Sequence, residues 1–334
     1  MTRIGINGFG RIGTAITRLA LQRPDMEIAV INDPGSPLAM LAHLFANDSV
    51  HGRVADVRHE EGKLIVGAAQ IPFYREWEPE SVPWGELGCD VVLECSGIFR
   101  SRDKAERFMK AGAPYVLISA PGTDVDATIV LGVNDESFDP SNHRIVSNAS
   151  CTTNCLAPVA KVLHENLGIM HGTMTTVHAY TNDQRLLDAA HKKDFRRARA
   201  AAVNIVPTST GAAKAVGLVL PELNGKLDGM AIRVPVPNVS LVDLAVRVES
   251  DTTAEAVNDM FRKAASEGPL QGILAVSDSP LVSTDYIGNP ASSTVDTELT
   301  KVMGGSSVKV ISWYDNEWGF SNRMVELAAR FPSR

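Results

Sequence analysis

A cysteine at the start of a predicted helix is the most reactive group that the sequence offers. Cys151 lies between the strand-like residues 144–146 and the helical pattern of 156–163, with Ser150 placed to cap the helix. Unpaired N–H groups and the dipole at a helix start favour an anion, so we expect the pKa of this thiol to be low. The alternative is a buried cysteine that packs as a small apolar side chain. Cys155, one turn further along, is expected to be structural.

An activated thiol requires a base within reach, and His178 is the best candidate. It lies near the end of residues 172–180, which are rich in β-branched side chains and predict a strand. A structural histidine is the alternative, and geometry decides between the two. The eight histidines and four cysteines show no spacing typical of a metal site, so no metal is expected.

Two further segments could bind an anion such as phosphate. Residues 209–214 open a predicted helix that ends at Pro221, and they combine hydroxyls, a glycine and free helix N–H groups. Arg233 ends a predicted strand and could offer its planar guanidinium to a phosphate. Each feature could instead be a helix cap or part of a surface ion pair.

The first 33 residues carry the clearest local signal. Strand-like residues 4–6 lead into Gly8, Gly10 and Gly13 in the spacing G-x-G-x-x-G, and a helix and second strand follow, ending at Asp33. These glycines permit a tight turn, the approach of a pyrophosphate, and close packing of the helix on the strand. Asp33 can accept hydrogen bonds from a ribose and would repel a 2′-phosphate, so the motif favours NAD over NADP.

A dinucleotide site followed by a reactive cysteine indicates one particular reaction. A thiolate can add to an aldehyde, and the resulting hemithioacetal can release a hydride to a nicotinamide. The product is a thioester, which a second nucleophile must cleave. A base such as His178 would remove the proton of the hemithioacetal hydroxyl.

The remaining patterns indicate which elements would position these groups. Strand and helix patterns alternate over residues 38–146, which predicts a parallel, doubly wound sheet with the cofactor at the carboxyl ends of its strands. Ser119 follows one of these strands, 115–118.

The pattern changes near residue 150, where a second domain is expected to begin. Its predicted strands alternate as in an antiparallel sheet, with examples at 230–234, 240–248 and 308–313. Helix 254–266, opened by a capping box from Thr252 to Glu255, would cover this sheet. The fold class is therefore α/β with an added α+β domain. The long charged loop 182–202 is expected to be functional or an interface, unless it is a solvated face.

Length and composition limit the class to which the protein can belong. With 334 residues the chain is long enough for two domains, and 44% hydrophobic and 21% charged residues are typical of a globular protein. The net charge of −7 argues against nucleic acid as the main partner, and no apolar run predicts a membrane span. Four cysteines without a disulfide pattern, and an N-terminus without a signal sequence, predict a cytoplasmic protein.

Six motifs, in order along the chain, resemble those of the glyceraldehyde-3-phosphate dehydrogenase family of phosphorylating glycolytic enzymes. They are residues 6–13 (INGFGRIG), 147–154 (SNASCTTN), 178–181 (HAYT), 208–215 (TSTGAAKA), 233–235 (RVP) and 313–319 (WYDNEWG). The resemblance implies a homotetramer with a Rossmann-type NAD-binding domain over residues 1–150. It also implies a catalytic domain over 151–316 with a mostly antiparallel sheet and an S-shaped loop at 180–203. The C-terminal helix, 317–334, would pack back onto the NAD-binding domain.

The resemblance also implies roles for single residues. Cys151 would be the nucleophile and His178 the base in the oxidation of D-glyceraldehyde 3-phosphate to 1,3-bisphosphoglycerate. The substrate phosphate would be bound by Thr181 and Arg233, and inorganic phosphate by Ser150, Thr152, Thr210 and Gly211. NAD would be contacted by Gly8, Gly10, Arg11, Ile12, Gly13, Asp33, Ser119, Asn182 and Asn316, the last through the carboxamide.

Three departures from the family pattern bear on the cofactor. Ala189-Ala190 stands where NAD-specific bacterial relatives tend to have Leu-Pro, residues 34–36 are small, and Trp77 stands where an arginine is expected near the adenine. We expect NAD as the main cofactor because Asp33 is retained, and the departures leave room for some use of NADP.

Two other functions are alternatives. The first is an erythrose-4-phosphate dehydrogenase, for which phosphate would be dispensable. The second is a non-enzymatic binding role, which the basic loop could suggest and the net acidity argues against.

Overall fold

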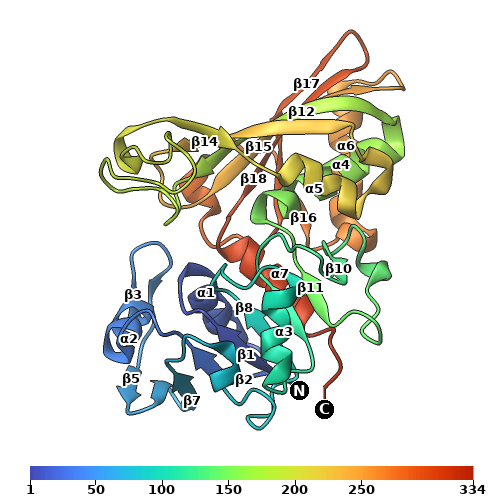
Figure 1. The fold of residues 1–334 in the computed structure, drawn as a ribbon. Helices are drawn as coiled ribbons and strands as arrows, with labels where there is room; N and C mark the ends of the chain where they lie inside the picture. Colours follow the sequence, from blue (N-terminus) through green and yellow to red (C-terminus); the bar gives the residue numbers. More distant parts are fainter. Residues whose placement is uncertain (334) are drawn as a thin grey trace. The chain divides into compact units, whose positions relative to one another are not determined.

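The computed structural model of the chain describes residues 1–333, which form two compact units (Figure 1). Unit 1 comprises Met1–Ile129, Glu136–Ala149 and the segment from Ser321 onward. Unit 2 comprises Val130–Asp135 and Ser150–Phe320. Within the described residues, no helix is both long enough and apolar enough to cross a membrane.

Unit 1 is built on a mostly parallel sheet, in agreement with the doubly wound architecture that the sequence predicts. Within residues 1–333 its strands lie in the order β10 (Ala127–Thr128), β11 (Ile145–Ser147), β9 (Val116–Ile118), β8 (Val91–Glu94), β1 (Thr2–Asn7), β2 (Met26–Asn32), β7 (Ala69–Tyr74), β6 (Lys63–Val66) and β5 (Val57–Glu60). β1 pairs in parallel with β2 on one side and β8 on the other, so the strand order reverses at β1. At one edge, β5, β6 and β7 pair in antiparallel fashion.

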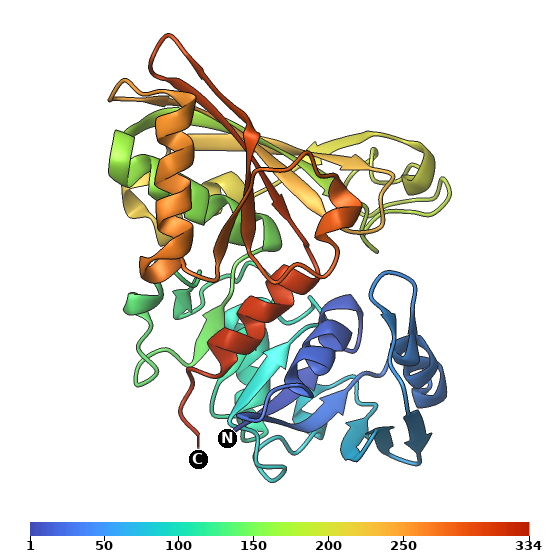
Figure 2. The same ribbon diagram turned by 180° about the vertical axis from the view of Figure 1, so that it is seen from behind.

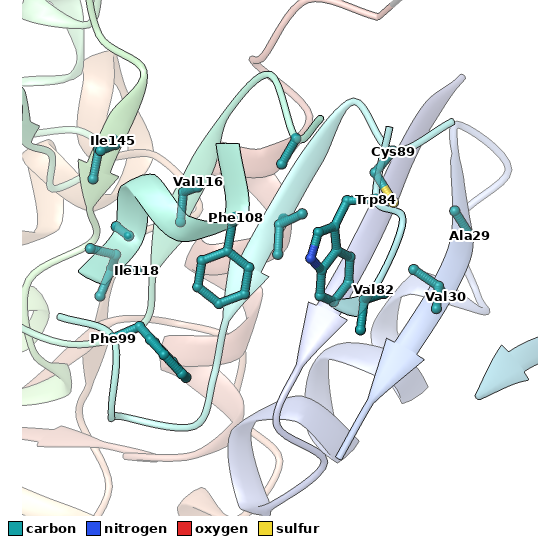
Figure 3. Close-up of a cluster of buried hydrophobic side chains, with 13 residues drawn as sticks. Ala29, Val30, Val82, Trp84, Cys89, Phe99, Phe108, Val116, Ile118 and Ile145 are labelled. Carbon is teal, nitrogen blue, oxygen red and sulfur yellow. The ribbon is translucent and has the colours of Figure 1, made fainter. Parts of the chain in front are cut away.

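Helices connect the parallel strands of unit 1. Its helices and a small hairpin are α1 (Arg11–Ala20), α2 (Leu38–Ala46), α3 (Arg102–Lys110), β3 (Asn47–Asp48) and β4 (Gly52–Arg53). Figure 3 shows part of the core between these elements, with Trp84 beside Phe108 and Phe99 below them. The Trp84 and Phe108 ring centroids are 5.7 Å apart, and Phe99 meets Phe108 edge-on at 5.3 Å. Such aromatic pairs stabilise the core of unit 1.

Unit 2 contains a second sheet that is mostly antiparallel, as expected. Within the described residues its order is β13 (Val206–Ser209), β14 (Leu227–Val234), β12 (Ile169–Ala179), β15 (Ser240–Val248), β18 (Ser307–Tyr314), β17 (Ser293–Met303) and β16 (Leu274–Ser277). Two pairs, β12–β14 and β16–β17, are parallel, which the sequence patterns did not indicate. Alternate residues of β15 are buried, which explains the apolar–polar alternation of its sequence.

Helices α4 (Cys151–Leu167) and α6 (Ala254–Ser266) cover one face of this sheet and lie side by side, as Figure 2 shows. The bounds of α6 agree with the predicted helix, but the predicted capping box is wrong. The N-cap is Thr253, whose hydroxyl accepts from the backbone N–H of Ala256. The cap therefore lies one residue later than Thr252, and Glu255 is not in the capping-box position. The remaining α-helices of residues 1–333 are α5 (Ala212–Val219) in unit 2 and α7 (Trp318–Ala328), which belongs to unit 1 from Ser321 onward.

Candidate active site

The start of α4 presents Cys151 as the sequence predicts. Ser150 is the N-cap in extended conformation, and its Oγ accepts a hydrogen bond from the backbone N–H of Thr153 at 3.0 Å. Cys151 is the first helical residue and is partly exposed, whereas the helix behind it is almost entirely buried. The thiol therefore lies at the free end of a rigid element.

Cys155, one turn along α4, is fully buried. Its Sγ contacts the Ser293 hydroxyl at 3.5 Å and the Ser312 carbonyl at 3.8 Å. Burial raises the pKa of this thiol to about 12. Cys155 therefore stays protonated near neutral pH, which supports its predicted structural role.

His178 lies within reach of the Cys151 thiol. It is the second-last residue of β12 and is 4% exposed, and its Nε2 is 3.6 Å from the Sγ of Cys151. The Tyr314 ring meets the imidazole edge-on at a centroid distance of 5.9 Å, which limits how the imidazole can tilt. The two groups are placed to exchange a proton.

Arg233 completes this cluster from the neighbouring strand. In the parallel pairing of β12 and β14, Arg233 stands opposite His178. Its Nη1 lies 2.9 Å from Nδ1 of His178, 2.9 Å from the Ala179 carbonyl oxygen and 3.5 Å from Oγ1 of Thr181. Its Nε–H is buried and has no partner within residues 1–333. A guanidinium with an unused donor beside a hydroxyl is suited to bind an anion.

Burial has the largest influence on the charge of both reactive groups. It lowers the pKa of His178 to about 3, and the positive charge of Arg233 adds to this effect, so the imidazole is neutral at pH 7. Burial raises the pKa of the Cys151 thiol, whereas the charge of Arg233 and hydrogen bonds at the helix start lower it. The net direction is upward, so the expectation of a low pKa is wrong. That expectation included the helix dipole and left out the loss of water around the sulfur.

The two contacts of His178 Nδ1 favour opposite tautomers of the imidazole. Arg233 can only donate, so its contact with Nδ1 favours an unprotonated Nδ1 and a proton on Nε2. The Ala179 carbonyl oxygen, 2.7 Å from Nδ1, can only accept and favours the opposite tautomer. An anion that binds the Arg233 guanidinium would leave Nδ1–H to donate to Ala179, and Nε2 would then face the thiol as an acceptor.

A second cationic group lies at the start of α5. Thr210 Oγ1 accepts from the Ala212 N–H at 3.2 Å, and the exposed Gly211 is the N-cap without a side-chain cap. The Arg197 guanidinium donates to Thr208 Oγ1 at 2.9 Å and to the Ser209 carbonyl at 3.2 Å. The positive charge of Arg197 contributes to the lowered pKa values of His178 and Arg233. The sequence analysis did not predict Arg197 as a site residue, because its loop contains many charged residues and no pattern distinguishes one of them.

Tyr314 is a further group that sequence reasoning missed. Its buried hydroxyl hydrogen-bonds to Thr152 Oγ1 at 2.8 Å and to Thr176 Oγ1 at 2.9 Å. The Thr152 side chain therefore points into the protein. Tyr314 stands 162 residues from Thr152 in the sequence, so no local pattern links them.

The glycine turn of unit 1 fits a dinucleotide. Gly8 has φ +99, and a Cβ there would lie 2.6 Å from the backbone nitrogen of Ser96. A Cβ on Gly13 would lie 2.0 Å from the carbonyl oxygen of Gly8, so helix and turn are in close contact. In front of Gly10 there is open space, and no side chain caps the start of α1, which begins with Arg11 and Ile12. A helix start of this kind, preceded by open space at Gly10, suits a pyrophosphate.

Acidic groups flank this turn. The carboxylate of Asp33 accepts from the Phe9 N–H at 2.7 Å and the Gly35 N–H at 2.8 Å, which fixes it at the carboxyl end of β2. The Arg11 guanidinium pairs with the buried carboxylate of Asp48. Through that pair the side chain of Arg11 is directed to Asp48.

A buried polar chain crosses three strand ends and was not predicted. Asn32 Nδ2 donates to Asn7 Oδ1 at 2.8 Å, and Asn7 Nδ2 donates to Glu94 Oε2 at 2.6 Å. Glu94 Oε1 accepts from the Ser96 N–H at 2.9 Å, and burial raises the pKa of Glu94. The sequence did contain a signal for this chain of hydrogen bonds, because each of these polar residues ends or follows a strand of the parallel sheet.

The remaining predicted contacts are spread over separate segments. Ser119 follows β9, and its N–H donates to the Glu94 carbonyl at 3.0 Å. Asn182 is exposed in the charged loop, and Trp77 is also exposed. Asn316 is buried, and its Oδ1 accepts from the Ser240 hydroxyl at 2.8 Å. Of the predicted residues, the structure thus brings Cys151, His178, Thr181 and Arg233 into one cluster.

The chain combines a doubly wound sheet of the kind that binds dinucleotides with a thiol–imidazole pair and an adjacent arginine. These features together define a cysteine-dependent dehydrogenase. Comparison with known proteins agrees with this class. The model of the glyceraldehyde 3-phosphate dehydrogenase NAD-binding domain matches residues 2–102, and that of the C-terminal domain matches residues 150–316. The chain belongs to the glyceraldehyde-3-phosphate dehydrogenase family.

Full-length relatives lead to the same family. The chain is 56% identical to glyceraldehyde-3-phosphate dehydrogenase of Geobacillus stearothermophilus over 333 residues, which cover 99% of this chain and 98% of that protein. It is 55% identical to the enzyme of Streptomyces coelicolor, covering 97% of each chain. It is 56% identical to glyceraldehyde-3-phosphate dehydrogenase 1 of Bacillus subtilis, covering 98% and 97%. The resemblance, the fold class and the NAD-binding domain that the sequence predicts are confirmed.

Proposed function

We propose that the chain catalyses the phosphorylating oxidation of D-glyceraldehyde 3-phosphate with NAD, with Cys151 as nucleophile and His178 as base. The observation that carries the roles of these residues is the 3.6 Å separation of Sγ and Nε2 beside the Arg233 guanidinium. A partly exposed thiol at a helix start next to a buried, neutral imidazole is suited to a reaction that makes and breaks a bond to sulfur.

The first step forms a bond between Sγ of Cys151 and the aldehyde carbon. The thiol proton passes to Nε2 of His178 and from there to the aldehyde oxygen, which gives a hemithioacetal. His178 then removes the proton of the new hydroxyl while the carbon loses its hydrogen with the electron pair. NAD, when bound, supplies the acceptor for this hydride. The carbon is now a thioester of Cys151.

Inorganic phosphate completes the reaction. A phosphate oxygen bonds to the thioester carbon, the carbon–sulfur bond breaks, and the electron pair returns to Cys151. The product is an acyl phosphate, and the proton held by His178 is returned to the thiolate or to solvent. The charge that develops on the substrate oxygen in both steps lies near the first-turn N–H groups of α4.

Two sets of residues account for the two phosphates. Arg233 and Thr181 bind the phosphate of the aldehyde, and the buried, unpartnered Nε–H of Arg233 supports this role. Ser150, Thr152, Thr210 and Gly211 bind inorganic phosphate, with Arg197 held against the strand that leads into α5. Arg197 is itself paired with the carboxylates of Asp183 and Asp194, so of the two guanidiniums that of Arg233 is the one with a donor left for an anion.

NAD is bound by the glycine turn and by single contacts along both units. Gly8, Gly10 and Gly13 with the N–H groups of Arg11 and Ile12 hold the pyrophosphate, and Asp33 binds the adenosine ribose. Ser119, Asn182 and Asn316 make the further contacts, with Asn316 on the nicotinamide carboxamide. Residues 1–150 serve as the NAD-binding domain with the C-terminal helix returned to it, and residues 151–316 as the catalytic domain.

The loop 180–203 supports assembly into a homotetramer. Its charges are largely paired within the loop, as in Arg199 with Asp188. Its exposed side chains include three large apolar ones: Leu186 and Leu187 are 79% and 75% exposed, and Phe195 is 95% exposed. Such side chains, gathered on one loop, are typical of a surface that packs against other copies. The four free cysteines support a cytoplasmic location.

One assay tests the proposal. Purified protein is mixed with glyceraldehyde 3-phosphate or erythrose 4-phosphate, with NAD or NADP, and with or without phosphate or arsenate. We expect NADH formation that prefers glyceraldehyde 3-phosphate, depends on the oxyanion, and is lost in Cys151→Ala. Turnover of erythrose 4-phosphate without phosphate would instead indicate the related dehydrogenase, and salt-sensitive nucleic-acid binding without turnover would indicate a binding protein.

A further inference from the structure

Ser240 lies where two segments of the site are joined. It is the first residue of β15, is 2% exposed and pairs with Tyr314 across the ladder. Its Oγ accepts a hydrogen bond from the backbone N–H of Ala179 at 3.0 Å and donates one to Oδ1 of Asn316 at 2.8 Å. Ala179 directly follows the base His178, so one buried hydroxyl links the strand that carries the base to the Asn316 carboxamide.

The hydrogen-bonding capacity of Ser240 fixes which end of the carboxamide faces outward. The Ala179 N–H can only donate, so it uses a lone pair of Oγ and leaves the single hydroxyl proton to be given. The carbonyl oxygen of Asn316 can receive that proton, whereas its NH2 group cannot. The reverse orientation would leave a buried hydroxyl without an acceptor, which is unfavourable.

The backbone on both sides holds this arrangement in place. Asp315 anchors the chain next to Asn316, because its carboxylate accepts from the N–H groups of Glu317, Trp318 and Gly288 at 2.9, 2.8 and 2.8 Å. Val239, just before Ser240, is buried at φ +69, in the left-handed region that a β-branched residue rarely adopts. Strain of this kind persists where surrounding structure imposes it, and it is concentrated at functional sites.

We propose that Ser240 is a positioning residue that holds Asn316 with its NH2 group toward the dinucleotide, so that the site recognises the carbonyl oxygen of the nicotinamide. The proposal rests on the proposed function, in which Asn316 contacts the NAD carboxamide. The protein then accepts a dinucleotide that keeps this oxygen and lacks the amide nitrogen, such as 3-acetylpyridine adenine dinucleotide. It discriminates against thionicotinamide adenine dinucleotide, because sulfur is a weak acceptor.

Equilibrium binding measured by calorimetry tests the proposal without turnover. NAD and the two analogues are titrated into the wild-type protein, Ser240→Ala, Ser240→Thr and Ser293→Ala. Ser293 is a matched control, since it is a buried serine of the same sheet whose hydroxyl bonds to Ser312 at 2.7 Å and not to Asn316. Melting temperatures are recorded in parallel.

In the wild-type protein we expect the acetylpyridine analogue to bind about as tightly as NAD and the thionicotinamide analogue about tenfold more weakly. In Ser240→Ala the ratio of the thionicotinamide and NAD dissociation constants falls toward one, because the amide is free to turn. Ser240→Thr, which keeps the hydroxyl, and Ser293→Ala retain the wild-type ratio.

An unchanged ratio in Ser240→Ala would overturn the proposal even if every ligand bound more weakly, since a purely structural effect weakens all three alike. Strong rejection of the acetylpyridine analogue by the wild-type protein would also overturn it, and this result does not depend on whether Ser240→Ala folds. A wild-type protein that binds none of the three dinucleotides would instead contradict the proposed function.

Discussion

The Nε2 atom of His178 lies 3.6 Å from the Sγ atom of Cys151, so the end of a β-strand and the start of a helix place an imidazole beside a thiol. The imidazole is buried, its ring is limited by Tyr314, and its other nitrogen is in contact with Arg233. One ring nitrogen of His178 therefore faces the thiol, and the other faces the guanidinium.

Replacing His178 by asparagine should slow the chemical step. The change keeps a polar side chain of similar size and removes the group that accepts the proton, so we expect hydride transfer to fall by about 10²- to 10⁴-fold. Single-turnover formation of NADH measures this step. His171→Asn is the matched control, because His171 is an exposed residue of the same strand. A loss of less than tenfold in His178→Asn would show that another group is the base.

Removing the charge of Arg233 should make the thiol less acidic. The positive charge of Arg233 lowers the pKa of the Cys151 thiol against the effect of burial. In Arg233→Gln, the pH profile of Cys151 alkylation by iodoacetamide should therefore shift to higher pH, with slower reaction at any fixed neutral pH. Arg199→Gln, an exposed arginine paired with Asp188, should leave the profile in place. A shift to lower pH would contradict the electrostatic role of Arg233.

Asp33 should set the preference between the two cofactors. Its carboxylate binds the Phe9 and Gly35 N–H groups and lies where a ribose is expected, so its charge opposes a 2′-phosphate. In Asp33→Ala we expect kcat/KM for NAD to fall and the NAD-to-NADP ratio of kcat/KM to decrease by about tenfold or more. Asp25→Ala, at the opposite end of β2, is the control. If the NAD-to-NADP ratio of kcat/KM is unchanged in Asp33→Ala, Asp33 does not contact the ribose.

The ion pair of Asp48 with Arg11 should contribute to stability in a pH-dependent way. Burial opposes ionisation of Asp48, but hydrogen bonds from Arg11 and from the backbone of His51 and Val50 outweigh it and lower the pKa from 3.8 to about 2. Because the folded-state pKa is depressed, this contribution is present above about pH 4 and is lost as the pH falls through 2. We expect Asp48→Asn to reduce the free energy of unfolding by about 2 kcal/mol at pH 7.

Urea unfolding of wild type and Asp48→Asn at a series of pH values measures this effect. The difference between the two proteins should shrink as the pH falls from 4 toward 2. A difference that stays constant over this range would show that the pair does not act through the ionisation of Asp48.

The features that depend on neighbouring residues could be predicted from the sequence. The turn at Gly8, Gly10 and Gly13, and the helix start at Cys151, each follow from a few consecutive residues. The capping of α6 shows the limit of such reasoning, because Thr252 and Thr253 are chemically alike and only backbone geometry selects the second. The alternating doubly wound sheet was predicted correctly, but the two parallel pairs in the second sheet were not.

The parts of the site that depend on distant residues could not be predicted. The contact of Thr152 with Tyr314 and that of Ser240 with Asn316 join residues 162 and 76 positions apart, and periodicity carries no information about such pairs. The net pKa of the Cys151 thiol depends on how much water the folded chain removes, and a sequence pattern does not report this quantity.

Catalysis through a thioester on Cys151 is tested most directly by a rapid-mixing experiment without phosphate. Mixing the protein with NAD and glyceraldehyde 3-phosphate should give a burst of NADH close to one per active site, and mass spectrometry should locate a glyceroyl group on Cys151. Adding phosphate should release this group and restore turnover. A full burst in Cys151→Ala, or acylation of Cys155 in the wild-type protein, would contradict the account.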